Sequence, residues 1–285
     1  MKRVGIQARL VRYGRLAALG SLVATVFLCD VRGQGSIGII PLFHDRTDRV
    51  EGDDIVQLTH QRVIVFVYRN AAAVYMDAGF VNTESDSIKH EIALPSSGHT
   101  SIRSSARSNG ILGVRLWVGG ERVEPATEEG KVKWYTITPA FGSHEEKSIR
   151  ALFWIETAMS NADAVAGQDS SPIAEGNRAL LVDLEHASAW KDVIQSVDVS
   201  VTLRESLTRR NAQVRVEPKN YVDQNAGYLW SMQDVEPSFN DDISILYTPP
   251  GMMTSHWNTR AKLSDYMTTT VYDELLRYVR QLDEE

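Results

Sequence analysis

The stretch RVIVFVYRNAAAVYMDAGF, residues 62–80, decides the fold class. Its first seven residues are a short run of β-branched and aromatic side chains, which is typical of a strand buried on both faces. Further along, Val74, Met76, Ala78 and Phe80 recur at a period of two, so they lie on one face of a second strand. Neither run is long enough to span a membrane. The stretch therefore predicts two buried strands.

The same patterns continue through most of the chain. VIQSVDVSVTL, residues 193–203, and SIRALFWIE, residues 148–156, alternate apolar and polar residues at a period of two. LGVRLWVGGERVEP, residues 112–125, predicts a hairpin, because Gly119-Gly120 tolerates the positive φ angles of a type I′ turn. Many short strands without helical patterns between them predict an all-β protein built from antiparallel sandwiches.

The predicted strands fall into two groups. Residues 158–177 are small and polar, contain one proline and show no periodicity, so they predict a linker. We therefore expect two antiparallel β-sandwich units in tandem, residues 55–157 and residues 178–250, although the pattern leaves open whether both halves share one core.

The C-terminal segment, residues 251–285, contains the one predicted α-helix, at about residues 270–283. Thr270 and Asp273 have the spacing of a capping box at its start. One apolar stripe runs along it, formed by Val271, Leu275, Val279 and Leu282. Docking on the protein's own sheet is favoured over docking on a membrane-bound partner, because a stripe only one helix long is usually buried within its own chain.

The first 33 residues resemble a secretory signal peptide. Five basic residues precede the apolar run Leu16–Cys29, and Val31 and Gly33 suit cleavage before Gln34. Five cations ahead of the run argue against a buried N-terminal helix. The composition of residues 34–54 predicts an extended segment that leads into the first unit. We expect an exported protein, in the periplasm or outside the cell.

Removal of residues 1–33 makes the protein more acidic. Of 30 basic and 37 acidic residues in the chain, six basic and one acidic fall in this segment, which leaves 24 and 36 and a net charge near −12. Such a charge disfavours binding to nucleic acids and to anionic lipids. The only cysteine, Cys29, is also removed, so no disulfide, thiol nucleophile or thiolate metal site is expected.

No sequence motif identifies a catalytic residue. The sequence contains no G-x-S-x-G nucleophile elbow, no H-E-x-x-H zinc motif, no Gly-rich phosphate loop and no EF-hand loop. The seven histidines lack the spacing of zinc ligands. PSSGH, residues 95–99, contains two serines and a histidine but favours a polar turn. His90 alternates with Ile88, Ile92 and Leu94 on one face of a predicted strand, which favours a core histidine over a ligand.

Acidic clusters are the only candidates for a metal site. Carboxylates are the ligands that Ca²⁺ prefers, and they gather at Asp45, Asp48, Glu51, Asp53 and Asp54, with a smaller pair at Asp241 and Asp242. Arg46 and Arg49 lie within the first cluster, so a solvated charged segment is favoured and no metal ligand is assigned. Alternation puts Leu112, Val114 and Leu116 on one face of their strand. Trp117 points opposite to them and could lie outward as a sugar-stacking residue, although cover by other parts of the chain explains it equally well.

Loose motifs in both halves resemble an uncharacterised family of exported bacterial proteins that carry a domain of unknown function. The resemblance covers about residues 55–250, including VYMDAGFVNTESDSIKHEIALPSSG, WKDVIQSVDVSVTL and YLWSMQDVEPSFNDDISILYTP. It implies a β-rich envelope protein and carries over no catalytic or binding residue. The residues that carry the resemblance are Leu94, Pro95, Trp134, Phe141, Glu145, Trp230, Glu236 and Pro237.

With this resemblance, residues 225–247 favour a structural seam over an active site. Trp230 would plug the end of a sandwich, Glu236 would accept a backbone hydrogen bond, and Pro237 would stop strand pairing. The predicted function is an exported, non-catalytic protein with a structural or protein-interaction role, whose partner is another envelope protein. The alternative is a Ca²⁺-dependent carbohydrate-binding protein or glycan hydrolase on the same scaffold.

Overall fold

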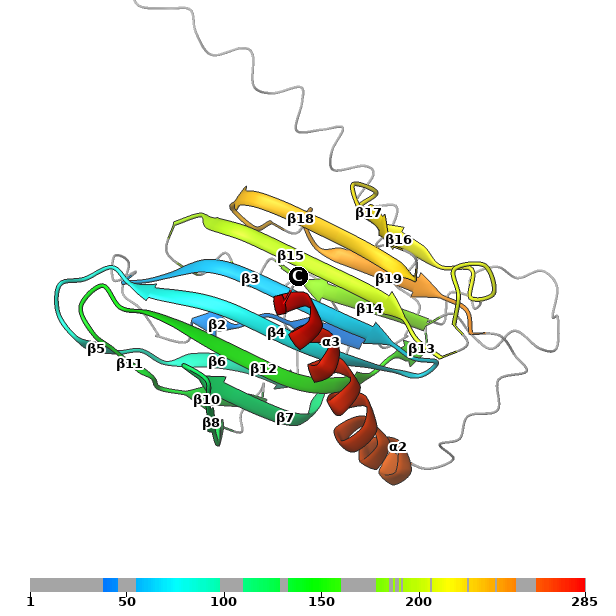
Figure 1. Ribbon diagram of the computed structural model, residues 1–285, viewed down its shortest axis with the longest axis horizontal. Coiled ribbons are helices and arrows are strands. Elements are labelled where there is room, and N and C mark those ends of the chain that lie inside the picture. Colours follow the sequence, from blue (N-terminus) through cyan, green and yellow to red (C-terminus); the bar gives the residue numbers. More distant parts are fainter. Residues whose placement is uncertain are drawn as a thin grey trace, which may run out of the picture.

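The computed structural model is mostly strands and ends in a helical segment (Figure 1). It describes residues 38–45, 55–97, 110–128, 133–159, 178–184, 187, 190, 192–205, 207–224, 226–238, 240–249 and 260–284. The predicted signal peptide, the acidic residues after Asp45 and most of the predicted linker lie outside these ranges. The prediction of an all-β fold with a short C-terminal helix is confirmed.

The largest sheet has eight strands. Their order is β17 (Val222–Gln224), β18 (Gly227–Val235), β15 (Ile194–Leu203), β3 (Val56–Val67), β4 (Ala71–Asn82), β12 (Glu146–Glu156), β7 (Ile111–Val118) and β8 (Glu121–Val123). The pairing of Val63–Val67 with β4 agrees with the two strands expected from residues 62–80.

Three smaller sheets complete the strands. A five-stranded sheet contains β1 (Gly38–Pro41), β14 (Arg178–Asp183), β19 (Ile243–Tyr247) and β16 (Arg215–Glu217), with β13 (Ala158–Met159) paired on β14. A four-stranded sheet contains β2 (His44–Asp45), β6 (Ile92–Ser97), β10 (Lys133–Ile137) and β9 (Ala126–Glu128), and a ribbon pairs β11 (Ala140–Phe141) with β5 (Ile88–Lys89).

The two halves of the chain do not form separate tandem units, in contrast to our expectation. Strand β15 of the second half pairs in parallel with β3 of the first, with Val199 opposite Val63 and Val201 opposite Val65. In the five-stranded sheet, β1 likewise pairs in parallel with β14. The sheets are therefore mixed, and both halves share one core. A period of two shows which face of a strand is buried but does not identify its neighbour.

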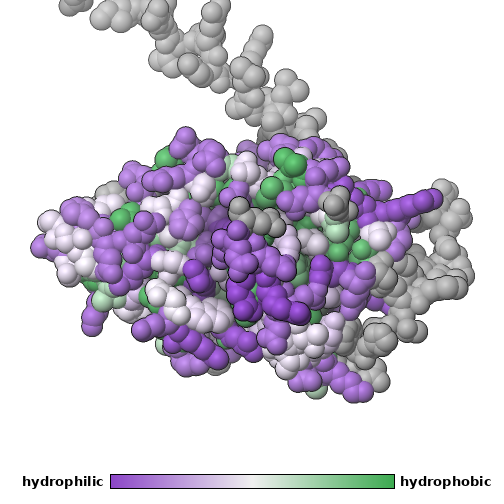
Figure 2. Space-filling view, viewed as in Figure 1, coloured by the Kyte–Doolittle hydropathy of each residue, from purple (hydrophilic) through white to green (hydrophobic). Residues whose placement is uncertain are grey.

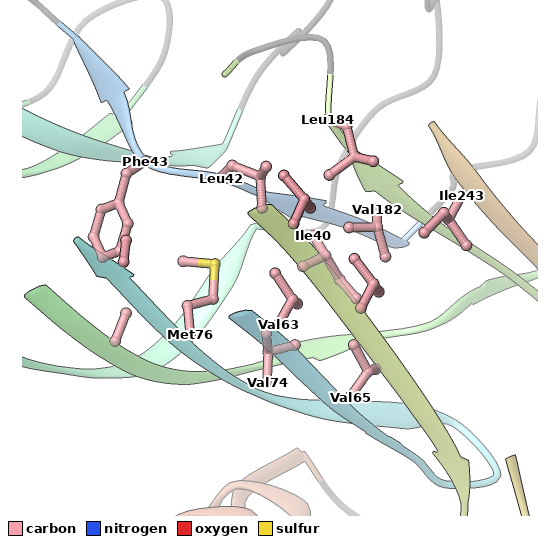
Figure 3. Close-up of a cluster of buried hydrophobic side chains, with 14 of the residues drawn as sticks. Ile40, Leu42, Phe43, Val63, Val65, Val74, Met76, Val182, Leu184 and Ile243 are labelled. Atoms are coloured by element: carbon pink, nitrogen blue, oxygen red, sulfur yellow. The ribbon is translucent and has the colours of Figure 1, made fainter. Parts of the chain in front are cut away.

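The shared core lies between the inner face of the eight-stranded sheet and the smaller sheets. Figure 3 shows Ile40, Val182 and Ile243 of the five-stranded sheet directed toward Val63 and Val65 of the large sheet. The residues predicted to share the buried face of β4 all belong to this core, as do Val197, Val199, Val201 and Leu203 of β15. Burial of these side chains is the main source of stability in a chain that lacks disulfides.

The helical segment covers the opposite, outer face of the eight-stranded sheet (Figure 1). It consists of α2 (Arg260–Tyr266), one π-helical turn η3 (Met267–Val271) and α3 (Tyr272–Glu284). Val271, Leu275 and Val279 are buried against Ile64, Phe66 and other residues of β3, β4 and β12, which confirms docking on the protein's own sheet. The exposed side of the helix is mostly hydrophilic (Figure 2). No helix within the described ranges is long and apolar enough to cross a membrane.

The start of the helix differs from the prediction. Helical structure begins at Arg260, ten residues earlier than expected, so Thr270 lies inside the π-helical turn and caps no N-terminus. The hydroxyl groups of Thr268 and Thr269 donate to the carbonyl oxygens of Ser264 and Asp265, at 2.9 and 2.7 Å. Threonine side chains that satisfy backbone carbonyls suit a turn whose main-chain hydrogen bonds are irregular.

A bulge in β7 holds the helix in place. Gly113 has a φ angle of 62°, and the ladder between β7 and β12 shifts register beside it. The hydroxyl group of Tyr272 donates to the Gly113 carbonyl oxygen at 2.9 Å, and Arg115 donates to the Thr268 carbonyl oxygen at 2.9 Å. The bulge turns Leu112 toward the helix while Val114 packs on the inner core, so these two residues do not share a face as predicted.

The hairpin turn at Gly119-Gly120 is confirmed. Its two glycines have φ angles of 58° and 89°, both in the region that a type I′ turn requires, and it joins β7 to β8. A Cβ atom on Gly120 would meet nothing within 4 Å, whereas one on Gly113 would lie 2.8 Å from Thr268 Cγ2 and 3.0 Å from the Tyr272 hydroxyl oxygen.

We expect Gly113→Ala to lower the free energy of unfolding by more than Gly120→Ala does. Both variants place alanine at a positive φ angle, which costs about 1–3 kcal/mol. Only the Cβ atom of Gly113→Ala would also clash with Thr268 and Tyr272 of the helical segment. Urea unfolding followed by circular dichroism measures both values. Equal losses would show that the close contact between β7 and the helix contributes nothing.

Candidate functional site

A buried pair of ionisable residues joins β2 to the loop between β5 and β6. His90 is 1% exposed, and its Nε2 atom lies 3.2 Å from Asp45 Oδ1. The His90 backbone N–H donates to the Pro139 carbonyl oxygen at 3.1 Å, which ties this loop to the residue before β11. The prediction of a core histidine is therefore confirmed. Asp45 is buried beside a histidine rather than solvated, and Asp48, Glu51, Asp53 and Asp54 lie outside the described residues.

Trp190 connects this buried pair to the surface. Its indole N–H donates to the Phe43 carbonyl oxygen at 2.9 Å, and its ring centroid lies 4.8 Å from that of Phe80 and 5.9 Å from that of His90. Sequence reasoning did not single out Trp190. The available signal was one large aromatic residue in a stretch of small and polar residues, which is typical of a side chain that anchors a loop in a core.

A surface pocket of about 530 Å³ opens next to Trp190. Asp192 and Val193, which precede β15, and Glu236 and Pro237, which follow β18, form its other walls. Val193 is 39% exposed and is one of few large apolar side chains so exposed in the described part of the chain. The pocket therefore combines two exposed carboxylates with an apolar lining.

Most of the candidate residues in 225–247 have structural contacts. Trp230 is fully buried, and its indole N–H donates to the Pro218 carbonyl oxygen at 2.9 Å. Asp241 accepts hydrogen bonds from the N–H and hydroxyl groups of Ser238, both at 2.8 Å, and Asp242 accepts one from the Leu184 N–H at 2.8 Å. These contacts agree with the predicted seam, whereas Glu236 is exposed at the pocket rim.

The outer face of the large sheet carries a second charged group beside the helix. Asp77 lies 3.4 Å from both Arg62 and Arg150, and it accepts a hydrogen bond from the Ser148 hydroxyl group at 2.8 Å. Arg62 also forms an ion pair with Asp283 of α3 at 2.8 Å. Burial raises the pKa of nearby Tyr75 to about 12, and the negative charge of Asp77 adds to this effect. This network joins three strands to the end of the helix.

The remaining candidate residues also contact their own chain. Trp117 does point opposite to Leu116, but it packs beside the helix rather than standing free in solvent. The Ser96 hydroxyl group donates to the Ile111 carbonyl oxygen at 3.5 Å, while His99 lies outside the described ranges. Within those ranges, no group of three or more histidine, cysteine, aspartate or glutamate side chains is arranged to hold a metal ion.

The residues that carry the family resemblance have structural neighbours as well. Leu94 and Phe141 are buried in the core. Glu145 accepts a hydrogen bond from the Gly142 N–H at 2.6 Å and forms an ion pair with Lys147 at 2.7 Å. The Gly142 hydrogen bond and then Lys147 lower the pKa of the Glu145 carboxyl group, because both stabilise its charged form.

Comparison with known proteins shows similarity of fold alone. No family model and no curated protein matches the chain. A proposed nutrient binding protein from Legionella pneumophila matches with a TM-score of 0.55 and 11% identity over 75% of this chain and 71% of that one. An M1 zinc metallopeptidase from Deinococcus radiodurans and the leukotriene A4 hydrolase of Saccharomyces cerevisiae reach TM-scores of only 0.37 and 0.40, at 13% and 11% identity. This chain covers 44% and 32% of those two proteins, and they cover 71% and 72% of it.

We expect Asp77→Asn to lower the free energy of unfolding by about 1–3 kcal/mol, because it removes a nearly buried charge between two arginines. The change keeps the side-chain shape, so the loss reports on charge. Asp86→Asn at an exposed position is the matched control, with an expected change within about 0.5 kcal/mol. Urea unfolding measures both. Equal effects would mean that the network does not stabilise the sheet.

Alkaline pH should unfold the protein through its buried tyrosines. Burial raises the pKa of Tyr68, Tyr75, Tyr247 and Tyr272 above the ordinary value of 10.0, for Tyr75 to about 12. Above pH 10 the unfolded chain can ionise these groups and the folded chain cannot, so stability is lost as the pH rises from 10 toward 12. Tyrosinate absorbance and circular dichroism should change together. Tyr75→Phe should reduce this loss, and ionisation of the four buried tyrosines without unfolding would contradict the prediction.

Proposed function

We propose that the chain is an exported, non-catalytic protein with a structural or protein-interaction role in the bacterial cell envelope. The N-terminal pattern supports export, and the acidic charge disfavours nucleic acids and anionic membranes as partners. The nutrient-binding role proposed for the Legionella protein is not transferred to this chain, because 11% identity supports a shared fold and no shared ligand.

One observation carries this proposal: two groups of buried ionisable side chains join strands to one another. Asp45 and His90 link β2 to the loop after β5, and Asp77 links β4 to β3 and β12. Groups engaged in this way are positioned by the fold and also stabilise it. A catalytic group would instead be directed into a cleft where a substrate can reach it.

The Ca²⁺-dependent carbohydrate-binding or hydrolase alternative has weaker structural support. It depends on the acidic segment and on Trp117 as an outward aromatic residue. Asp45, the one described member of that segment, is buried beside His90, and Trp117 packs beside the helix. The response of the unfolding midpoint to Ca²⁺ distinguishes the two functions.

The full chain, expressed in a bacterium and purified from its envelope fraction, tests both parts of the proposal. We expect the processed protein to begin at Gln34 by mass spectrometry. We also expect its midpoint of thermal unfolding to be the same in millimolar Ca²⁺ and in chelator. A bound ion at about 100 times its dissociation constant would add about 2.7 kcal/mol and raise the midpoint by several degrees.

Three results would contradict the proposal. A reversible rise in the unfolding midpoint with Ca²⁺ would favour the calcium-dependent alternative. Retention of residues 1–33 on a cytoplasmic protein would remove the export prediction. Turnover of any substrate that is lost on His90→Gln, in a variant that still folds, would show that the chain is an enzyme.

A further inference from the structure

The eight-stranded sheet has an unpaired edge along β18. On one side, β18 pairs with β15 from Gly227 to Val235. On the other side, β17 pairs only with residues 227–229. Within the described part of the chain, no strand pairs with the outer edge of residues 230–233, and Figure 1 shows β18 extending beyond β17. Alternate backbone N–H and C=O groups on this edge can therefore accept a further strand.

The acidic pocket lies at the end of the same strand. Val235 pairs with Ile194, and the next residues of each segment, Glu236 on one side and Val193 and Asp192 on the other, line the pocket. Glu236 lies three positions beyond Gln233, which corresponds to about 10 Å of extended chain. A peptide added to β18 would reach the pocket with a side chain about three residues beyond its pairing segment.

The charges around this edge select the kind of occupant. Asp192 and Glu236 are exposed carboxylates on an apolar wall, and Asp234, with a φ angle of 50°, marks the end of regular pairing. A lysine or arginine fits such a pocket, because its aliphatic stem packs on the apolar wall while its cationic end meets the carboxylates. A second copy of this chain is disfavoured, because the chain without residues 1–33 has 24 basic and 36 acidic residues, a net charge near −12, and two such copies repel one another.

We propose that β18 binds an extended, basic segment of a partner protein, which pairs with Trp230–Gln233 and places one lysine or arginine side chain in the pocket. This inference rests on the interaction role proposed above and specifies its surface and its partner chemistry. The backbone edge supplies affinity for any extended chain, and the pocket supplies selectivity for positive charge.

Blocked synthetic peptides test the proposal with the full chain after export. The probe KTSVTVTSK has a β-forming centre and a lysine at each end, so it serves either strand direction, and ETSVTVTSE is its acidic counterpart. Fluorescence anisotropy of the labelled peptides measures affinity. Amide hydrogen exchange measures protection of residues 230–233.

We expect the basic peptide to bind, to weaken as salt is added, and to slow exchange at residues 230–233. The acidic peptide should not bind at about 1 mM, since like charges oppose it. Asp192→Asn combined with Glu236→Gln should weaken the basic peptide about tenfold. The matched control, Glu121→Gln with Glu124→Gln at the opposite end of the sheet, should leave its affinity unchanged.

Three outcomes would overturn the proposal. The basic peptide fails to bind at about 1 mM, which is weaker than a specific site requires. It binds without protecting residues 230–233, or it binds the Asp192→Asn, Glu236→Gln variant with unchanged affinity. Sedimentation shows that the protein dimerises with these amides protected, so that a second copy is the occupant. None of these results alters the processed N-terminus or the calcium response, which test the proposed function separately.

Discussion

The parallel ladder between β3 and β15 is the contact on which the rest of the structure depends. It places the second half of the chain beside the first in one sheet, with Val199 next to Val63 and Val201 next to Val65. Both strands are apolar on the inner face, so their pairing creates a continuous surface for the smaller sheets to cover. A parallel pair cannot be joined by a tight hairpin, and here more than a hundred residues lie between the two strands.

The faces of the strands could be predicted from the sequence, but their neighbours could not. The period of two correctly assigned alternate residues to the core, from Val74 to Phe80 and from Val197 to Leu203, because alternation follows directly from strand geometry. The order of strands depends on contacts between distant residues, which alternation does not encode. The helix shows the same limit: its apolar stripe was correct at Val271, Leu275 and Val279, but its start was set by packing and not by Thr270.

The candidate site was predictable only in part, for a related reason. His90 could be assigned to the core because it alternates with Ile88, Ile92 and Leu94, yet its partner Asp45 lies 45 residues earlier and was grouped with a charged segment. Trp117 was placed on the correct face, but the helix that packs beside it comes from the other end of the chain. The pocket was not predicted, because its walls meet only after Ile194 has paired with Val235.

The arrangement of layers leaves the edges of the large sheet as its most accessible backbone. The inner face is covered by the smaller sheets, and the helix covers the outer face over β3, β4 and β12. At one edge, β8 is only three residues long and exposes Glu121 and Arg122, and short, charged strands resist pairing. At the other edge, β18 exposes the uncharged Ser231 and Gln233 before Asp234 ends the regular strand. The two edges therefore differ in their capacity to accept a strand, and the edge that retains this capacity is the one that leads to the acidic pocket.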